Sequence, residues 1–202
     1  MKNTTGSFST SVGAESSCNG TTSHSNAVLG YKALKLLTTG NSNVAIGREA
    51  MIATTTGAGN VAVGAYSLDA NTTGSNNTAI GLNSLGSNTT AGSNTAVGRL
   101  SLFDNTTGSF NTGLGVEALT NNTTGATNVA VGHQAGDSVT TGATGTYVGA
   151  YAGQAVTTGN GTYIGKNAGY NATTGVNNVA VGLSAGNDIF NITDQSNRIV
   201  LG

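Results

Sequence analysis

The fold is decided by one segment, which reads TTGNSNVAIG at residues 38–47 and returns along the whole chain. It contains two landmarks in constant phase, a Thr-Thr-Gly triplet and a pentapeptide close to Asn-(Val/Thr)-Ala-(Val/Ile)-Gly. The glycines that close the pentapeptide are Gly13, Gly30, Gly47, Gly64, Gly81, Gly98, Gly115, Gly132, Gly149, Gly165, Gly182 and Gly202. The eight intervals from Gly13 to Gly149 are each 17 residues long. The next three intervals are 16, 17 and 20 residues. This 17-residue period indicates that each repeat makes one lap of a solenoid.

We number each lap from its pentapeptide glycine, which is position 0. Position −1 is always aliphatic, which predicts that it faces a core; its residues are Val12, Leu29, Ile46, Val63, Ile80, Val97, Leu114, Val131, Val148, Ile164, Val181 and Leu201. Position +3 is Ala or Ser, which indicates close packing. Position +4 changes from Leu or Met in the first laps to glycine at Gly136, Gly153, Gly169 and Gly186.

The alternation in Val44-Ala45-Ile46 predicts a short strand, and Thr-Thr-Gly predicts a turn. We therefore expect an all-β fold, a parallel β-solenoid of about twelve 17-residue laps with two short strands per lap. The solenoid is expected over residues 1–186, and residues 187–202 form an irregular last lap or a transition to a further domain. Because the chain starts within a lap and stops on Gly202, we also expect it to be a shaft segment of a longer fibre.

Composition excludes several classes of protein. Gly (32), Thr (33) and Asn (25) make up about 45% of the 202 residues, far more than in an average globular domain. Lys and Arg together number only 7 and Asp and Glu together only 8, and the net charge of −1 argues against nucleic acid or a membrane surface as a partner. No segment approaches the roughly 20 apolar residues of a membrane span, so no membrane insertion is expected. The single Cys18 cannot form an internal disulfide.

Each lap offers only two or three sizeable apolar side chains for burial. The stabilisation from burying them is small beside the conformational entropy lost in ordering the whole lap, so self-association is expected. The Ala or Ser residues of position +3, together with the alanines of position −2, suit a close seam between identical chains; these alanines are Ala45, Ala62, Ala79, Ala96, Ala130 and Ala180. A parallel homotrimer is the preferred prediction. The alternative is that these small residues line a thin core within one chain.

The pentapeptides at residues 43–47, 60–64 and 128–132 resemble the head repeats of YadA-type trimeric autotransporter adhesins. Similar repeats occur in bacteriophage tail-fibre proteins, often ahead of a self-cleaving chaperone. The resemblance covers nearly the whole chain, although the lap is longer than the usual one of the family. It implies a left-handed β-roll homotrimer for surface attachment, extracellular on a virion fibre or a cell surface, with a host cell-surface glycan or protein as partner. The start of the chain lacks the apolar core of a secretory signal, which favours a virion fibre.

Residues with catalytic or ligand-binding chemistry are sparse. His24 and His133 lie far apart and have no Asp or Glu at ligand spacing, so no metal site is expected. No phosphate-binding loop and no paired acid and base can be found, which predicts a protein that is not an enzyme and has no cofactor or catalytic residue.

The tyrosines of the later laps are the remaining candidates for ligand contact. Tyr147 and Tyr163 replace the small residue of position −2 where leucine gives way to glycine at position +4. One interpretation is repacking, with a large ring filling vacated space. The other is an exposed aromatic strip, formed with Tyr151 and Tyr170, that stacks on sugars.

Two functions remain open besides the adhesive fibre. A regular threonine array could bind ice, and the rod could be a purely structural extracellular solenoid. Ice binding is the weaker prediction, because adjacent threonines in Thr-Thr-Gly point to different sides of a turn.

Overall fold

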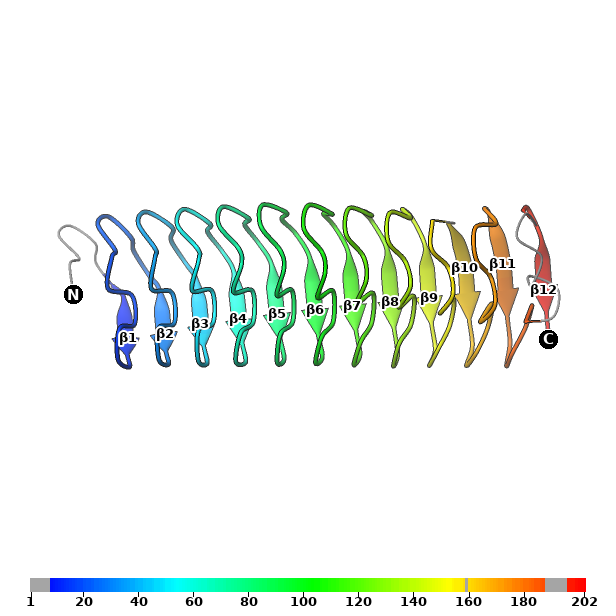
Figure 1. The fold of residues 1–202 in the computed structure, drawn as a ribbon, viewed down its shortest axis with the longest axis horizontal. Coiled ribbons are helices and arrows are strands. Elements are labelled where there is room, and N and C mark those ends of the chain that lie inside the picture. Colours follow the sequence, from blue (N-terminus) through cyan, green and yellow to red (C-terminus); the bar gives the residue numbers. More distant parts are fainter. Residues whose placement is uncertain (1–7, 159, 188–195) are drawn as a thin grey trace.

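The computed structural model describes residues 8–158, 160–187 and 196–202, and it shows a rod of stacked laps (Figure 1). Each described lap contributes one short strand to a single 12-stranded parallel sheet, in which every strand pairs with those of the neighbouring laps. The strands are β1 (Thr10–Val12), β2 (Ala27–Leu29), β3 (Val44–Ile46), β4 (Val61–Val63), β5 (Thr78–Ile80), β6 (Thr95–Val97), β7 (Thr112–Leu114), β8 (Val129–Val131), β9 (Thr146–Val148), β10 (Gly161–Ile164), β11 (Asn178–Val181) and β12 (Ile199–Leu201). The predicted parallel β-solenoid is confirmed. The prediction of two strands per lap is wrong, because the rest of each described lap consists of turns and bends.

The register of the sheet follows the repeat. Ala45 pairs with Ala62 across a lap of regular length, and Tyr147 pairs with Tyr163 across the shorter lap. Ala180 pairs with Val200 across the last interval, so β12 continues the sheet. Differences in lap length are therefore absorbed outside the strands. Half of the range 187–202, in which the transition is expected, consists of residues 188–195, which lie outside the described residues.

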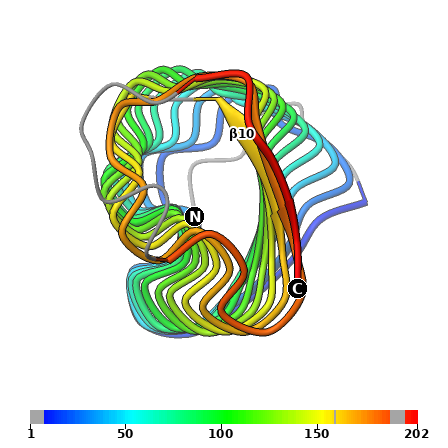
Figure 2. The same ribbon diagram turned by 90° about the vertical axis from the view of Figure 1, so that its right-hand side faces the viewer.

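The laps nearly superpose along the rod axis, with the strands on one side of the cross-section (Figure 2). The glycine at position 0 permits this stacking in two ways. Its φ lies between +129° and +147° in every lap from Gly13 to Gly182, a conformation that L side chains rarely adopt. A Cβ atom on Gly47 would also lie only 2.4 Å from the carbonyl oxygen of Gly64 in the next lap.

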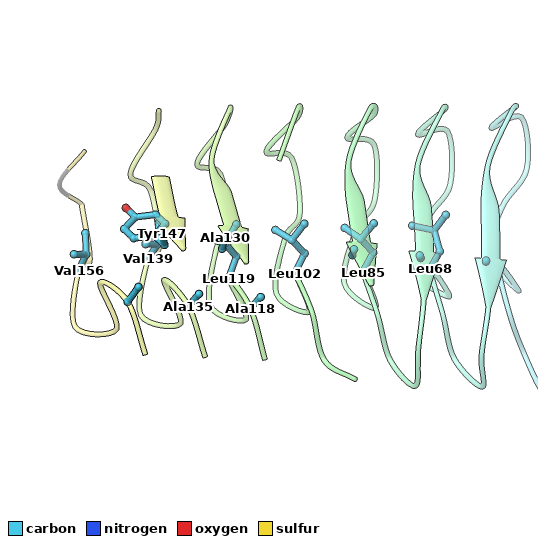
Figure 3. Close-up of a cluster of buried hydrophobic side chains, with 14 of the residues drawn as sticks. Leu68, Leu85, Leu102, Ala118, Leu119, Ala130, Ala135, Val139, Tyr147 and Val156 are labelled. Atoms are coloured by element: carbon cyan, nitrogen blue, oxygen red, sulfur yellow. The ribbon is translucent and has the colours of Figure 1, made fainter. Parts of the chain in front are cut away.

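The core lies behind the middle residue of each strand. Ala45 is fully buried, whereas its neighbour Ile46 is 38% exposed. A Cβ atom on Gly113, which takes the alanine position in β7, would meet Ser101 Oγ at 2.5 Å and Leu102 Cγ at 3.4 Å. The small position −2 therefore packs against positions +3 and +4. Leucines at position +4 follow one another along the rod (Figure 3); examples are Leu68, Leu85, Leu102 and Leu119.

These observations correct two predictions. The aliphatic position −1 does not face the core, because leucine at position +4 fills the interior opposite a small residue. The position −2 alanines do not form a seam between chains: Ala62 and Ala79 are fully buried within one chain. The alternative of a core lined by small residues within one chain is confirmed. The chain exposes 8153 Å², close to the roughly 8,600 Å² expected for a compact protein of its mass.

One ladder of buried asparagines occupies position −4. Asn43 Nδ2 donates a hydrogen bond to the carbonyl oxygen of Gly57 at 2.9 Å, and Asn43 Oδ1 accepts one from the backbone N–H of Asn60 at 2.9 Å. The pattern recurs for Asn60, Asn77, Asn94, Asn111 and Asn128. Direct amide-to-amide bonds between laps, which the stacked asparagines suggest, are secondary here at 3.2 Å. The ladder therefore fastens each strand to both the turn and the strand of the next lap.

A second asparagine ladder, at position +7, was not predicted. Asn88 Nδ2 donates to Asn71 Oδ1 at 3.0 Å, and the same bond links Asn105 to Asn88 and Asn122 to Asn105. The ladder ends because the next residue in the column is Val139. Asn122 Oδ1 is consequently buried without a hydrogen-bond partner within the described part of the chain.

Candidate functional site

The four candidate tyrosines divide between core and surface. Tyr147 and Tyr163 are fully buried, and their rings stack at 5.9 Å between centroids with 7° between planes. Burial raises the pKa of Tyr147, as expected for a phenol removed from water. Repacking is therefore the correct interpretation, and an exposed strip that includes these two rings is wrong.

Glycines make room for the buried rings. The Tyr147 ring lies between Gly136 and Gly153, where Cβ atoms would approach it to 2.9 Å and 2.3 Å. A Cβ atom on Gly145, at the asparagine position −4, would lie 2.3 Å from Tyr147 Oη. One tyrosine thus occupies the space that an asparagine and a leucine fill in earlier laps.

Tyr151 and Tyr170 lie nearer the surface. The Tyr151 ring meets His133 edge to face at 5.1 Å and Tyr170 at 6.4 Å. Tyr170 is 39% exposed. The row combines aromatic side chains from three successive laps, and ligand contact by Tyr151 and Tyr170 stays a prediction.

The outward side of the sheet, which we call the outer sheet face, is the most extensive candidate surface. It consists of positions −3 and −1 of every strand. Position −1 is aliphatic throughout, and Leu29, Ile46, Ile80 and Leu114 are among its exposed members. Position −3 carries Val, Thr, Ala or Ile. Neither column contains a charged residue from β1 to β12, so the face is uncharged along the length of the rod, with one aliphatic column and one column that mixes aliphatic residues with threonine.

A second candidate is a surface groove of about 540 Å³, which we call the Gly86 groove. Its lining consists of Tyr66, Asp69, Ala70, Asn83, Gly86, Ser87 and Phe103. The groove forms at position +5, where Gly86 has no side chain and the adjacent laps carry Asp69 and Phe103. A Cβ atom on Gly86 would lie 2.8 Å from the edge of the Phe103 ring. Its volume falls within the usual range of small-ligand sites.

Hydrogen bonds between laps form the floor of the groove. Ala70 N–H donates to the carbonyl oxygen of Gly86 at 3.2 Å, and Ser87 N–H donates to that of Phe103 at 2.9 Å. Burial raises the pKa of the Asp69 carboxyl, and the charge of Glu49 raises it further. Sequence reasoning missed this site. The available signal was position +5, which is Asp69, Gly86 and Phe103 in three successive laps.

Charged residues form short surface networks. Glu117 pairs with Arg99 and accepts a hydrogen bond from Gln134 Nε2 at 2.6 Å, and both contacts lower the pKa of the Glu117 carboxyl. No group of three or more His, Cys, Asp or Glu side chains that could hold a metal ion occurs among the described residues. Nor does the described part of the chain contain a helix long and apolar enough to cross a membrane.

No known protein family, curated protein or solved structure matches this chain. Its own fold defines it as a parallel β-solenoid repeat protein. The two surfaces described above, the outer sheet face and the Gly86 groove, are the features from which a function follows.

Proposed function

We propose that this chain is a non-enzymatic rod module of an extracellular fibre or adhesin, on a virion or a cell surface, which assembles as a homotrimer and attaches to a host surface. The observation that carries the proposal is the outer sheet face, an uncharged surface with an unbroken column of aliphatic side chains from β1 to β12. Large exposed apolar patches mark sites of association.

The size of this face suits a stable interface. Eight of its twelve position −1 side chains are more than a third exposed, and they follow one another from β1 to β12, which gives the continuous surface that a stable interface needs. A partner that follows the face over its whole length needs the same spacing between rows. A second copy of this chain has that spacing, which favours self-association over a globular partner.

The stoichiometry of three comes from the resemblance of the pentapeptides to YadA-type trimeric heads. If the chain instead formed a dimer through its outer sheet faces, the stoichiometry of three would be wrong, but self-association through this face would still hold. Attachment to a host surface comes from the same resemblance.

Sedimentation equilibrium tests the assembly. We expect a trimer for the native chain and a folded monomer for the triple variant Ile80→Lys, Val97→Lys and Leu114→Lys, because three buried charges would oppose association. The matched control places lysine at the exposed position +9 of three laps, as Thr73→Lys, Thr90→Lys and Thr107→Lys. A native monomer, or an outer-face variant that associates as tightly as the control, would contradict the assignment.

Retention on cells tests attachment. The labelled native protein should remain on at least one member of a panel of bacterial and eukaryotic cells after washing. Absence of retention on every cell type would contradict the adhesive role and leave a purely structural one.

Ice binding is the second candidate function. Six strands place threonine on the uncharged outer sheet face; these residues are Thr10, Thr78, Thr95, Thr112, Thr146 and Thr162. By contrast, the first threonine of each triplet is committed to the fold, as when Thr55 Oγ1 donates to the carbonyl oxygen of Thr72 at 3.1 Å. Thermal hysteresis in the native protein, abolished by the outer-face lysines, would favour ice binding over the fibre.

A further inference from the structure

We propose that the Gly86 groove binds a neutral saccharide of one or two sugar units. This inference rests on the proposed adhesive function and gives its ligand a chemical class. The groove interrupts an otherwise regular surface, because neighbouring laps carry side chains where Gly86 has none.

Two aromatic rings bound the groove. Tyr66 and Phe103 come from laps that are two apart, which corresponds to roughly 10 Å along the rod. Both side chains are half-buried, so their positions are restricted by packing while part of each ring remains accessible. Aromatic rings offer large apolar contact areas at low entropic cost, which suits the C–H faces of a sugar.

Three polar side chains complete the lining. The Asp69 carboxylate accepts hydrogen bonds, and the Asn83 amide and the Ser87 hydroxyl both donate and accept them. The side chains of Asn83 and Ser87 form no hydrogen bond to other described residues. They are therefore available to the hydroxyl groups of a sugar, each of which donates and accepts.

The charge of the groove disfavours an anionic ligand. Asp69 has no ion-pair partner among the described residues, whereas nearby Glu49 is paired with Arg48 at 3.5 Å. The guanidinium of Arg48 also lies 5.3 Å from the Tyr66 ring centroid. An acidic sugar or a phosphate would meet the unpaired Asp69 carboxylate, so uncharged sugars fit better.

Residues found in other laps supply the variants, and a side chain at Gly86 also requires the Phe103 ring to move, because a Cβ atom there would lie 2.8 Å from the ring edge. Gly86→Thr fills the groove with the residue that position +5 carries at Thr120. Phe103→Thr removes one ring in the same way, and Tyr66→Asn introduces the residue of position +2 at Asn83, where φ is also left-handed. Phe110→Asn is the matched control, because it removes an exposed aromatic ring outside the groove and introduces the residue that position −5 carries at Asn76, where φ is also left-handed.

Binding would be measured with an array of neutral glucose, galactose, mannose and N-acetylglucosamine mono- and disaccharides, followed by titration calorimetry with the strongest binder. We expect the native chain and Phe110→Asn to bind equally. Gly86→Thr, Phe103→Thr and Tyr66→Asn should each bind at least about tenfold more weakly, with unchanged circular dichroism spectra.

Three outcomes would overturn the groove: no binding of a neutral saccharide by the native chain, equal binding by Gly86→Thr, or binding of a cationic peptide alone. Trimer formation and cell retention measured on the same variants separate this inference from the proposed function. Native and Gly86→Thr proteins that form trimers and are retained equally on cells would overturn the groove alone. A native chain that binds saccharide without associating or being retained would overturn the proposed function alone.

Discussion

Asn122 shows how much a single side chain matters in a ladder. Each asparagine of position +7 donates to the one before it, so every amide oxygen except the last has a donor. A buried acceptor without a donor costs about 1–3 kcal/mol. The end of the ladder at Asn122 is therefore a local weak point in the interior.

A threonine at position 139 should correct this defect. Val139→Thr keeps the shape of the side chain and places a hydroxyl where it can donate to Asn122 Oδ1. We expect the new bond to offset the desolvation of the hydroxyl, leaving the free energy of unfolding unchanged or higher by about 1 kcal/mol. Chemical denaturation measures the difference.

Val156→Thr is the matched control, because Val156 is the next buried residue of the same column and has Val139 beside it instead of an asparagine. It should lower the free energy of unfolding by about 1–2 kcal/mol. Equal effects of the two substitutions would show that Asn122 Oδ1 gains nothing from the hydroxyl.

Two carboxyl groups should have opposite effects on stability as pH changes. Burial raises the pKa of Asp137 in the folded chain, so its stabilising contribution is present below the unfolded pKa and is lost as pH rises through the folded value. Gln134 and Arg99 lower the pKa of Glu117, so its contribution is present at neutral pH and is lost on acidification.

Neutral substitutions reveal both signs. We compare the free energy of unfolding at pH 7 minus that at pH 3. This difference should be larger in Asp137→Asn than in the native chain, and smaller in Glu117→Gln. Urea denaturation across this pH range provides the measurement. Shifts of the same sign in both variants would contradict the assignment.

The lap is the structural element of this fold, and residues at different positions of a lap change together. Where Tyr147 replaces alanine at position −2, Gly145 replaces asparagine and Gly153 replaces leucine. The three positions share one volume of core, so a change in one alters what the others can hold.

This sharing predicts energetic coupling. Gly145→Asn should clash with Tyr147, and Tyr147→Ala should leave a cavity that costs about 3–5 kcal/mol. The double variant restores the residues that other laps carry, and its loss should be smaller than the sum by at least about 1 kcal/mol. A double-mutant cycle from thermal melts tests this, and additive losses would refute a shared volume.

The inward face of the strand is tested by neighbouring residues of β5. Ala79→Leu should overpack the core at about 1–3 kcal/mol. Ile80→Asp, on the outer sheet face, should leave the fold of a single chain intact at concentrations below self-association. Thermal melting should therefore show a lower melting temperature for Ala79→Leu than for Ile80→Asp. The reverse order would show that position −1 is buried.

Much of this architecture was predictable, because the 17-residue period, the recurring glycines and the turns are properties of consecutive residues. The orientation of the strand was not, because alternation does not distinguish a core of alanine and leucine from one of valine and isoleucine. The paired change to Tyr147 and Gly153 already indicated that positions −2 and +4 meet. The Gly86 groove was not predictable, because it is formed by side chains from neighbouring laps and a single glycine in the sequence is only a weak signal of a groove.

At the scale of the molecule, stability should be a sum over laps and their contacts with neighbours. Deleting one whole lap, residues 99–115, joins Gly98 to Val116 and keeps every column in phase. We expect a folded, shorter rod with a lower melting temperature. Deleting only about half of that lap, residues 99–107, should abolish cooperative melting, because the columns on either side no longer align. Equal behaviour of the two deletions would contradict the repeat basis of the fold.

The orientation of the bonds between laps has a mechanical consequence. Bonds such as that from Thr55 N–H to the carbonyl oxygen of Thr72 run along the rod, and β1 and β12 lie at its opposite ends (Figure 1). Tension between the ends therefore loads the laps in series. Each lap that detaches releases roughly 55–60 Å of extended chain before the next one bears the load. A rod built in this way yields in steps and dissipates a pull that would otherwise break a single attachment.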